Sequence, residues 1–117
     1  MKPETRLINA IFHAFREDEG YHAEVEGVSL REALMGQLDR MATFPGVRRA
    51  PVLCDRYKPV ILLRFGFEDG SCHTLEDTGK RFGRSRERIR QIEGRTLRIM
   101  RHPAISQHLR PFIKPEA

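Results

Sequence analysis

The segment SRERIRQIEGR, residues 85–95, interleaves charged and amide side chains with isoleucines at fixed intervals. Arginine offers a planar fork of donors, glutamine one donor group and one acceptor, and glutamate two acceptor oxygens. With about 100° between successive residues of a helix, one stripe collects the side chains suited to a core: Ile89, Ile92, Thr96 and Ile99. The opposite side collects the hydrogen-bonding groups: Arg86, Glu87, Arg90 and Gln91. We therefore predict a helix over residues 85–101 with one buried face and one exposed polar face.

The exposed face has the chemistry needed to read base edges in a DNA major groove. Arginine pairs bidentately with guanine, glutamine pairs with adenine, and glutamate accepts from the cytosine amino group. The first turns of a recognition helix are the ones that enter the groove. The alternative is a solvated helix whose arginines pair with acids, but Glu87 and Glu93 are the only acids among nine Lys/Arg between Lys80 and Arg101. We interpret residues 85–101 as a recognition helix.

The charge distribution along the chain supports this interpretation. The 117 residues carry a formal net charge of +5. Residues 1–55 hold 7 Lys/Arg against 9 Asp/Glu, whereas residues 56–117 hold 14 against 7. Positive charge confined to one half is typical of a protein that binds a polyanion, although a basic surface without a partner is the alternative.

The N-terminal half predicts two amphipathic helices. Residues 4–17 place apolar side chains on one stripe: Leu7, Ile8, Ile11, Phe12 and Phe15. After a predicted loop over 17–27, Ser29 and Glu32 form a capping box. Behind this cap, apolar residues recur at helical spacing: Leu30, Leu34, Leu38 and Met41. The turn at Pro45-Gly46 is the expected boundary between an N-terminal helical element, 1–46, and a second domain, 47–117.

The second domain predicts four to five short helices. Asp55 can cap a helix through RYKPVILLRFG, and Thr74 begins a helix that Gly83 ends. Ser85 caps the recognition helix, which Pro103 stops, and ISQHLRPFI, residues 105–113, is expected to pack back onto the core. Two short helices separated by GRS match a helix-turn-helix. The predicted fold class is all-α, a C-terminal helix-turn-helix domain preceded by two amphipathic helices.

Several other classes of protein are disfavoured by the sequence. Cys54 and Cys72 form no Cys-x-x-Cys pair, and we read them as reduced thiols of an intracellular, cytoplasmic protein. No apolar run approaches the length of a membrane span, and the N-terminus lacks the pattern of a signal peptide. The five histidines show no metal-ligand spacing, and no catalytic set appears. We expect no metal, no cofactor and no enzymatic activity.

Residues 53–113 resemble region four of the primary bacterial sigma factors, without a gap. The resemblance is carried by RFG at 64–66, TLE at 74–76, RERIRQIE at 86–93 and RHP at 101–103. It implies a domain that recognises the −35 promoter element and docks on the flap of the RNA polymerase β subunit.

The resemblance also implies roles for individual residues. The residues implied to read bases are Arg86, Glu87, Arg90 and Gln91. Those implied to hold the DNA backbone are Arg56, Arg64, Leu75, Glu76, Lys80 and Arg88. Those implied to contact an activator or the polymerase are Phe65, Arg95, Arg98 and Arg101.

Some positions depart from the family pattern. Tyr57, Pro59 and Leu62 replace the usual residues of the first helix, which bears on flap docking more than on DNA reading. Residues 1–52 do not resemble sigma regions two or three, and the chain has no tryptophan. We therefore do not expect the chain to melt a promoter alone.

Three functions stay open on the sequence. The first is a sigma-like transcription factor that binds −35-type DNA and cooperates with RNA polymerase, its N-terminal helices forming a docking or regulatory element. The second is a flap-binding mimic that displaces the resident sigma factor. The third is a dimeric helix-turn-helix repressor, with the N-terminal helices as the dimer interface.

Overall fold

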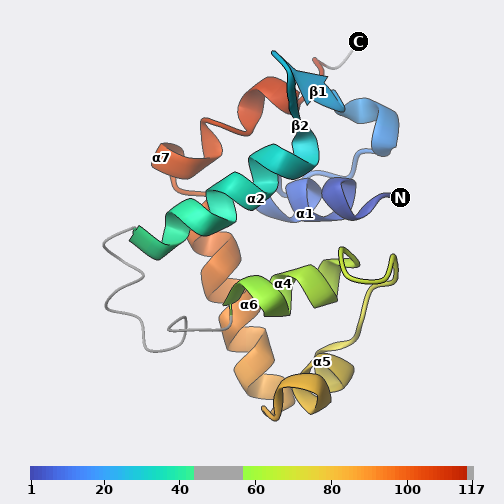
Figure 1. The fold of residues 1–117 in the computed structure, drawn as a ribbon, viewed down its shortest axis with the longest axis vertical. Helices are drawn as coiled ribbons and strands as arrows, with labels where there is room; N and C mark the ends of the chain where they lie inside the picture. The colour runs from blue at the N-terminus through green and yellow to red at the C-terminus, as the bar shows by residue number, and fades with distance from the viewer. Residues whose placement is uncertain (44–56, 116–117) are drawn as a thin grey trace.

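The computed structural model of the chain describes residues 1–43 and 57–115, and it is mostly helical (Figure 1). Six α-helices lie within these ranges: α1 (Pro3–Phe12), α2 (Leu30–Arg40), α4 (Tyr57–Phe65), α5 (Leu75–Phe82), α6 (Arg86–Met100) and α7 (Pro103–Ser106). Two short strands, β1 (Glu24–Val25) and β2 (Val28–Ser29), precede α2. Short 3-10 turns occupy Asp18–Gly20, Met41–Thr43 and Arg110–Phe112. The all-α prediction is confirmed, with a small hairpin added.

Side-chain caps fix the start of three helices at the positions that the sequence predicts. The hydroxyl of Ser29 accepts from the Glu32 amide at 3.0 Å, and that of Thr74 accepts from the Asp77 amide at 3.0 Å. Ser85 accepts from the Arg88 amide at 3.1 Å. Each bond satisfies an amide that has no partner inside its own helix. The predicted cap at Asp55 lies outside the described residues.

Helix α1 is shorter than the prediction of residues 4–17. It ends at Phe12, where His13 adopts a left-handed conformation with φ 52°. The side chain of Asn9 then closes the turn, because its amide donates to the Arg16 carbonyl at 2.9 Å and its oxygen accepts from the Arg16 amide. Phe15 consequently lies beyond the helix and is 98% exposed, so its assignment to the buried stripe is wrong.

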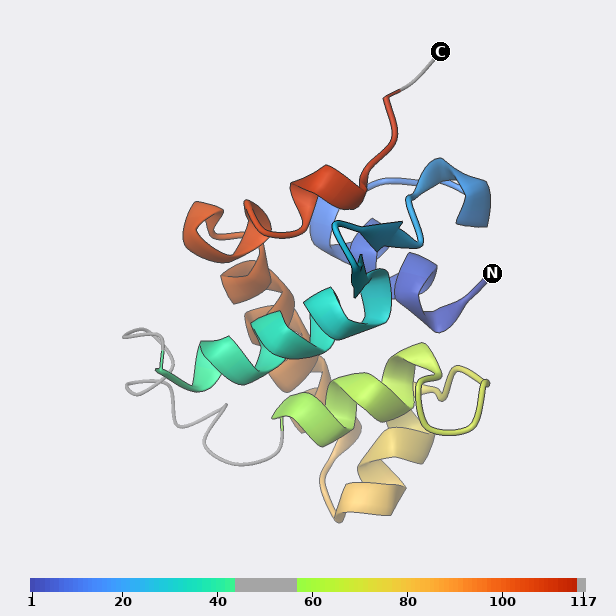
Figure 2. The ribbon, with the colours of Figure 1, turned by 45° about the horizontal axis from the view of Figure 1, so that its top comes forward.

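The C-terminal segment returns to the loop that follows α1 (Figure 2). The His22 amide donates to the Phe112 carbonyl at 2.7 Å, and the Lys114 amide donates to the Gly20 carbonyl at 3.1 Å. Leu109 and Phe112 of this segment are buried in the core, so its predicted packing onto the core is confirmed. Its predicted helix over 105–113 is replaced by α7 and a 3-10 turn, since Pro111 cannot donate the amide hydrogen that a continuous helix needs.

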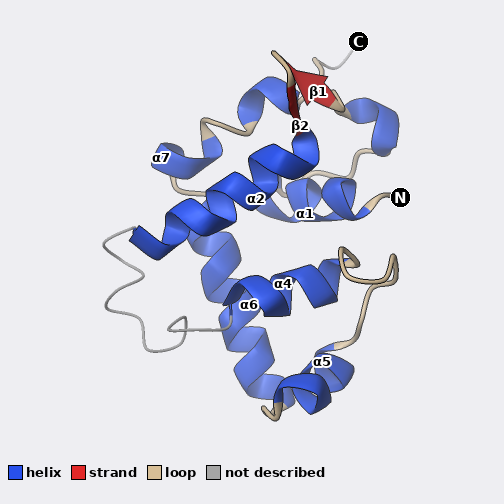
Figure 3. Cartoon of the chain, in the orientation of Figure 1, coloured by secondary structure: helices blue, strands red, loops and turns tan. Residues whose placement is uncertain are grey.

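A β-hairpin over residues 24–29 begins inside the predicted loop of residues 17–27 (Figure 3). Val25 pairs with Val28 across a two-residue turn. Both turn residues have positive φ, 51° at Glu26 and 82° at Gly27, as the favoured hairpin turns require. The last residue of the hairpin, Ser29, is also the N-cap of α2.

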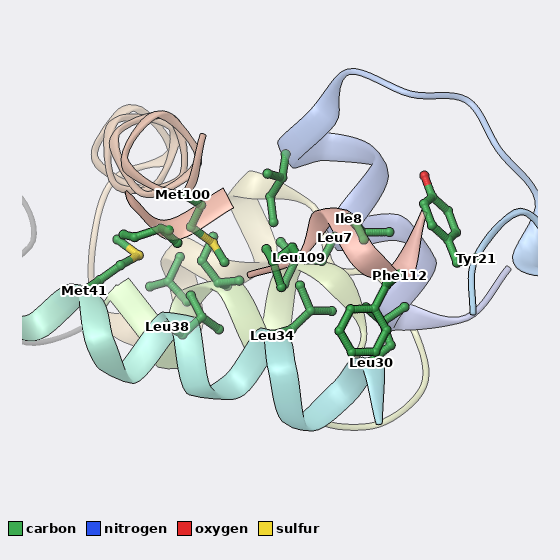
Figure 4. Packing of buried hydrophobic residues seen from close by; sticks show 14 of the residues in the cluster. Leu7, Ile8, Tyr21, Leu30, Leu34, Leu38, Met41, Met100, Leu109 and Phe112 are labelled. Atoms are coloured by element: carbon green, nitrogen blue, oxygen red, sulfur yellow. The ribbon is translucent and has the colours of Figure 1, made fainter. Parts of the chain in front are cut away.

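One cluster of buried apolar side chains joins the two halves of the chain. Its members come from α1, α2, α4, α6 and the C-terminal segment: Leu7, Ile8, Ile11, Leu34, Leu38, Ile61, Ile92, Met100, Leu109 and Phe112, among others. Figure 4 shows Leu34 and Leu38 of α2 pointing toward Leu109 and Met100. The apolar stripes of α1 and α2 thus pack against α6, and the proposed boundary at Pro45-Gly46 lies outside the described residues.

Candidate nucleic-acid interface

Helices α5 and α6 form a helix-turn-helix at the end of the molecule opposite the two termini (Figure 1). Helix α5 ends at Gly83, which adopts a left-handed φ of 64°, and the Arg84 amide donates back to the Gly79 carbonyl at 2.8 Å. Gly79 is buried against this turn, and a Cβ there would lie 2.5 Å from the Arg84 carbonyl oxygen. Only glycine therefore permits so close an approach between α5 and the turn.

Helix α6 has one buried and one exposed face, as the sequence predicts. Its buried side chains are Ile89, Ile92, Thr96 and Met100, whereas Ile99, which was predicted to be buried, is half-buried. Its first two turns expose all four predicted base-reading residues: Arg86, Glu87, Arg90 and Gln91. The structure therefore brings these four side chains together on one solvent-exposed surface.

Two of the predicted base-reading residues pair with each other. Arg90 Nε donates to Glu87 Oε2 at 2.9 Å, and Arg90 Nη2 donates to Glu87 Oε1 at 2.6 Å. The hydrogen bonds from Arg90 hold the pKa of the Glu87 carboxyl below its ordinary value, and the same pairing raises the pKa of Arg90. Both groups are charged at neutral pH, so Arg90 can exchange its partner for a base edge or a phosphate, and Glu87 can accept from a base amino group.

The predicted DNA-backbone residues fall into separate environments. Glu76 and Lys80 are exposed on α5 and lie 3.8 Å apart as an ion pair, while Leu75 is half-buried beside them. Arg88 is half-buried on α6. Arg56 lies outside the described residues. Lys80 is thus the exposed cation of this group on α5.

Arg64 makes internal contacts instead. Its Nη1 donates to the His73 carbonyl at 2.5 Å, and its Nη2 lies 3.1 Å from Glu93 Oε1 on α6. The side chains of Arg64 and Glu93 are only 23% and 15% exposed. Arg64 therefore joins α4 to α6 and to the loop that precedes α5.

The predicted activator or polymerase contacts also divide into two groups. Arg95 and Arg98 are exposed and line a shallow groove of about 580 Å³ along α6, together with Arg90, Gln91, Gly94 and Arg101. Arg101 is half-buried, because its Nε donates to the Ile11 carbonyl at 3.0 Å and its Nη2 donates to the Ala10 carbonyl at 2.8 Å. Phe65 is half-buried against the core.

Arg6 was not singled out by the sequence. It lies on α1 and donates to the carbonyl of Phe65, the last residue of α4, at 3.3 Å. No local pattern marks this contact, since the two residues are 59 positions apart.

Among residues 1–43 and 57–115, no three His, Cys, Asp or Glu side chains gather in a way that could hold a metal ion. Within the same ranges, no helix combines the length and apolar character needed to span a membrane.

The fold and the exposed polar face of α6 define a helix-turn-helix DNA-binding domain. Comparison with known families makes this assignment specific: residues 51–102 match the family described as sigma-70, region 4. The family resemblance found in the sequence is therefore confirmed.

Two curated proteins illustrate the similarity. The RNA polymerase sigma factor SigA of Lactococcus lactis subsp. cremoris is 41% identical to the chain over 99 residues, which are 85% of this chain and 25% of SigA. SigA of Lactococcus lactis subsp. lactis, strain IL1403, is also 41% identical over 99 residues, 23% of its length. The chain thus spans about a quarter of these relatives.

The similarity extends beyond the matched domain. Residues 51–117 number 67, so an alignment over 99 residues must include at least 32 residues that precede position 51. Part of residues 1–50, for which no resemblance to sigma regions two or three was predicted, therefore lies within the alignment to SigA.

Proposed function

We propose that the chain is a sigma-like transcription factor that reads −35-type promoter DNA in the major groove through α6. The observation that carries this proposal is the joint exposure of Arg86, Glu87, Arg90 and Gln91 on the first two turns of α6, within a sigma-70 region 4 domain. Their donors and acceptors are complementary to guanine, adenine and cytosine edges. Lys80 on α5 supplies an exposed cation for the adjacent DNA backbone.

The proposed protein partner is the core enzyme of RNA polymerase. Both relatives described above are named RNA polymerase sigma factors. Phe65, at the end of α4, and the exposed Arg95 and Arg98 are the proposed contacts with the β flap or with an activator bound beside the promoter. We place this activity in the cytoplasm and propose that the chain binds promoters without melting them.

A dimeric repressor is less well supported. That hypothesis assigns the apolar stripes of α1 and α2 to a dimer interface. In the structure, Leu7, Ile8 and Leu34 are fully buried within a single chain, so these side chains already have an intramolecular partner.

Footprinting on promoter DNA, with and without polymerase core enzyme, tests the proposal. We expect weak protection of a −35-type element by the full chain alone and stronger protection when core enzyme is present. Binding to the polymerase without any protection of DNA would support the flap-binding mimic. Protection of a palindrome by a dimer would support the repressor.

A further inference from the structure

Three arginines, Arg6, Arg64 and Arg101, form what we call the arginine frame, because each joins two different segments through its guanidinium. Arg64 joins α4 to α6 and to the loop before α5. Arg6 joins α1 to the end of α4, and Arg101 joins the end of α6 to the end of α1. Together these contacts connect α1, α4 and α6 into a closed triangle.

The contact between Arg101 and α1 has a clear physical basis. The last carbonyls of a helix have no partner within the helix and carry partial negative charge, which a nearby cation stabilises. Helix α1 has no basic residue in its own last turn. Arg101 supplies that cation from α6, and its planar fork reaches two successive carbonyls, those of Ala10 and Ile11.

The contact between Arg6 and α4 is closely packed. Gly66 follows the Phe65 carbonyl with φ 91°, and a Cβ at Gly66 would lie 2.7 Å from Arg6 Nη1. The guanidinium therefore rests directly against the turn by which the chain leaves α4. This turn begins the connection to α5, whose first residues are proposed to lie beside the DNA backbone.

The frame determines how two parts of the DNA-binding surface are placed relative to each other. Base readout depends on α6, whereas the approach to the backbone depends on α5 and on the connection from α4. Helix α1 contacts both α4 and α6 at their C-terminal ends through Arg6 and Arg101. Because Arg64 also joins the end of α4 to Glu93 in the middle of α6, α6 is held at two points along its length, which restrains its angle to α4.

We propose that Arg6 and Arg101 are positioning residues for base readout, which act through α1 by fixing the orientation of α6 relative to α4 and α5. The inference rests on the proposed function of α6. It assigns a role in DNA recognition to a helix that lies outside residues 51–102, the segment matched by the region 4 family.

The test compares Arg101→Ala with Arg40→Ala in the full chain. Arg40 is the control, because it is exposed on α2, its Nη1 lies 2.7 Å from His108 Nε2, and it is not one of the proposed DNA or polymerase contacts. Fluorescence anisotropy would measure binding to a −35-type duplex, to the same duplex with one base pair changed, and to both at several salt concentrations. We expect Arg101→Ala to weaken specific binding by about two- to thirtyfold, with reduced discrimination and an unchanged salt slope. Arg101→Lys should restore part of the loss, since one ammonium keeps the charge but not the fork.

Two results would overturn the proposal. A salt slope reduced by about one would show that Arg101 contacts a phosphate directly. Unchanged affinity and unchanged discrimination, at a temperature where the variant is fully folded, would show that Arg101 contributes only to stability. If Arg101→Ala does not fold, Arg6→Ala tests the other end of α1 by the same measurements, because it removes one hydrogen bond instead of two.

A second readout separates this inference from the proposed function. If the wild-type chain does not distinguish the two duplexes, the proposed function fails whatever the variants do. Hydrogen exchange in the free chain then decides the inference: the amides of residues 83–91 should exchange faster in Arg101→Ala than in Arg40→Ala. Equal exchange in both variants would contradict it.

Discussion

The chain uses arginine in two different ways, and the two sets lie at opposite ends of the same helix. At the start of α6, Arg86 and Arg90 are exposed, and Arg90 bonds to the neighbouring Glu87. At its end, Arg101 is half-buried and bonds to carbonyls of α1 that lie 90 positions away in the sequence. One set is available to a polyanion, and the other holds the protein together. The contacts of each arginine in a basic segment must therefore be known before that arginine is counted as a DNA ligand.

The largest loss of stability and of DNA binding is expected for a substitution at the turn between α5 and α6, which positions the exposed arginines. In Gly79→Ala, the new methyl group would clash with the Arg84 carbonyl, whose backbone cannot move away freely. We expect a loss of about 3 kcal/mol in the free energy of unfolding, with DNA binding weakened at least tenfold. Thermal unfolding and anisotropy would measure the two losses.

Gly94→Ala is the matched control for this substitution. Gly94 is exposed on α6, and a Cβ there would meet open space. Replacing it should stabilise the helix by about 1 kcal/mol. Equal stability of the two alanine variants would contradict the close approach of α5 to the turn.

Arg86→Ala is the sharpest test of the exposed set. Because Arg86 is exposed, its removal should change stability by no more than about 0.5 kcal/mol. It should cost about 1–3 kcal/mol of binding to a −35-type duplex and relax discrimination at one base pair. Gln91→Ala should behave alike at a different base pair. Unchanged sequence preference in both variants would exclude α6 as the reading helix.

In contrast to Arg86→Ala, Arg64→Ala should lower the stability of the protein. It removes hydrogen bonds to the His73 carbonyl and to Glu93, and leaves that carboxylate poorly solvated. We expect a loss of about 1–2 kcal/mol of stability. The salt slope of DNA binding should stay unchanged, which distinguishes this internal role from the backbone contact implied by the family resemblance. A salt slope reduced by about one would show that Arg64 contacts the DNA backbone directly.

The smallest effect is expected for Glu87→Gln. The substitution removes the carboxylate that holds Arg90, and both side chains are exposed, so stability should barely change. Arg90 would then be released toward phosphates, and affinity for unrelated duplexes should rise at low salt. Binding to a −35-type duplex and to an unrelated duplex gives the ratio of the two affinities, which measures specificity. This specificity ratio should fall in Glu87→Gln. A higher ratio than in the wild-type chain would show that Glu87 restrains specific recognition.

Local features of this fold could be predicted from the sequence, whereas distant contacts could not. Ser29, Thr74 and Ser85 mark helix starts because a cap acts within three residues. The two faces of α6 follow from helical spacing alone. The partners of Arg64 and Arg101 depend on helices brought together by folding, and no spacing rule gives them. The end of α1 was missed for another reason, since the side chain of Asn9 closes the turn against the continuing apolar pattern.

The pairing of residues 20–22 with residues 112–114 has a consequence for synthesis of the chain. Translation produces α1 and α2 before Leu109 and Phe112, which complete the apolar surroundings of these helices. Until then, the emerging chain carries Leu30, Leu34 and Tyr21 without their final neighbours. Closure of this apolar cluster must therefore wait for residues 109–112, and until then the chain exposes apolar surface of the kind that favours aggregation.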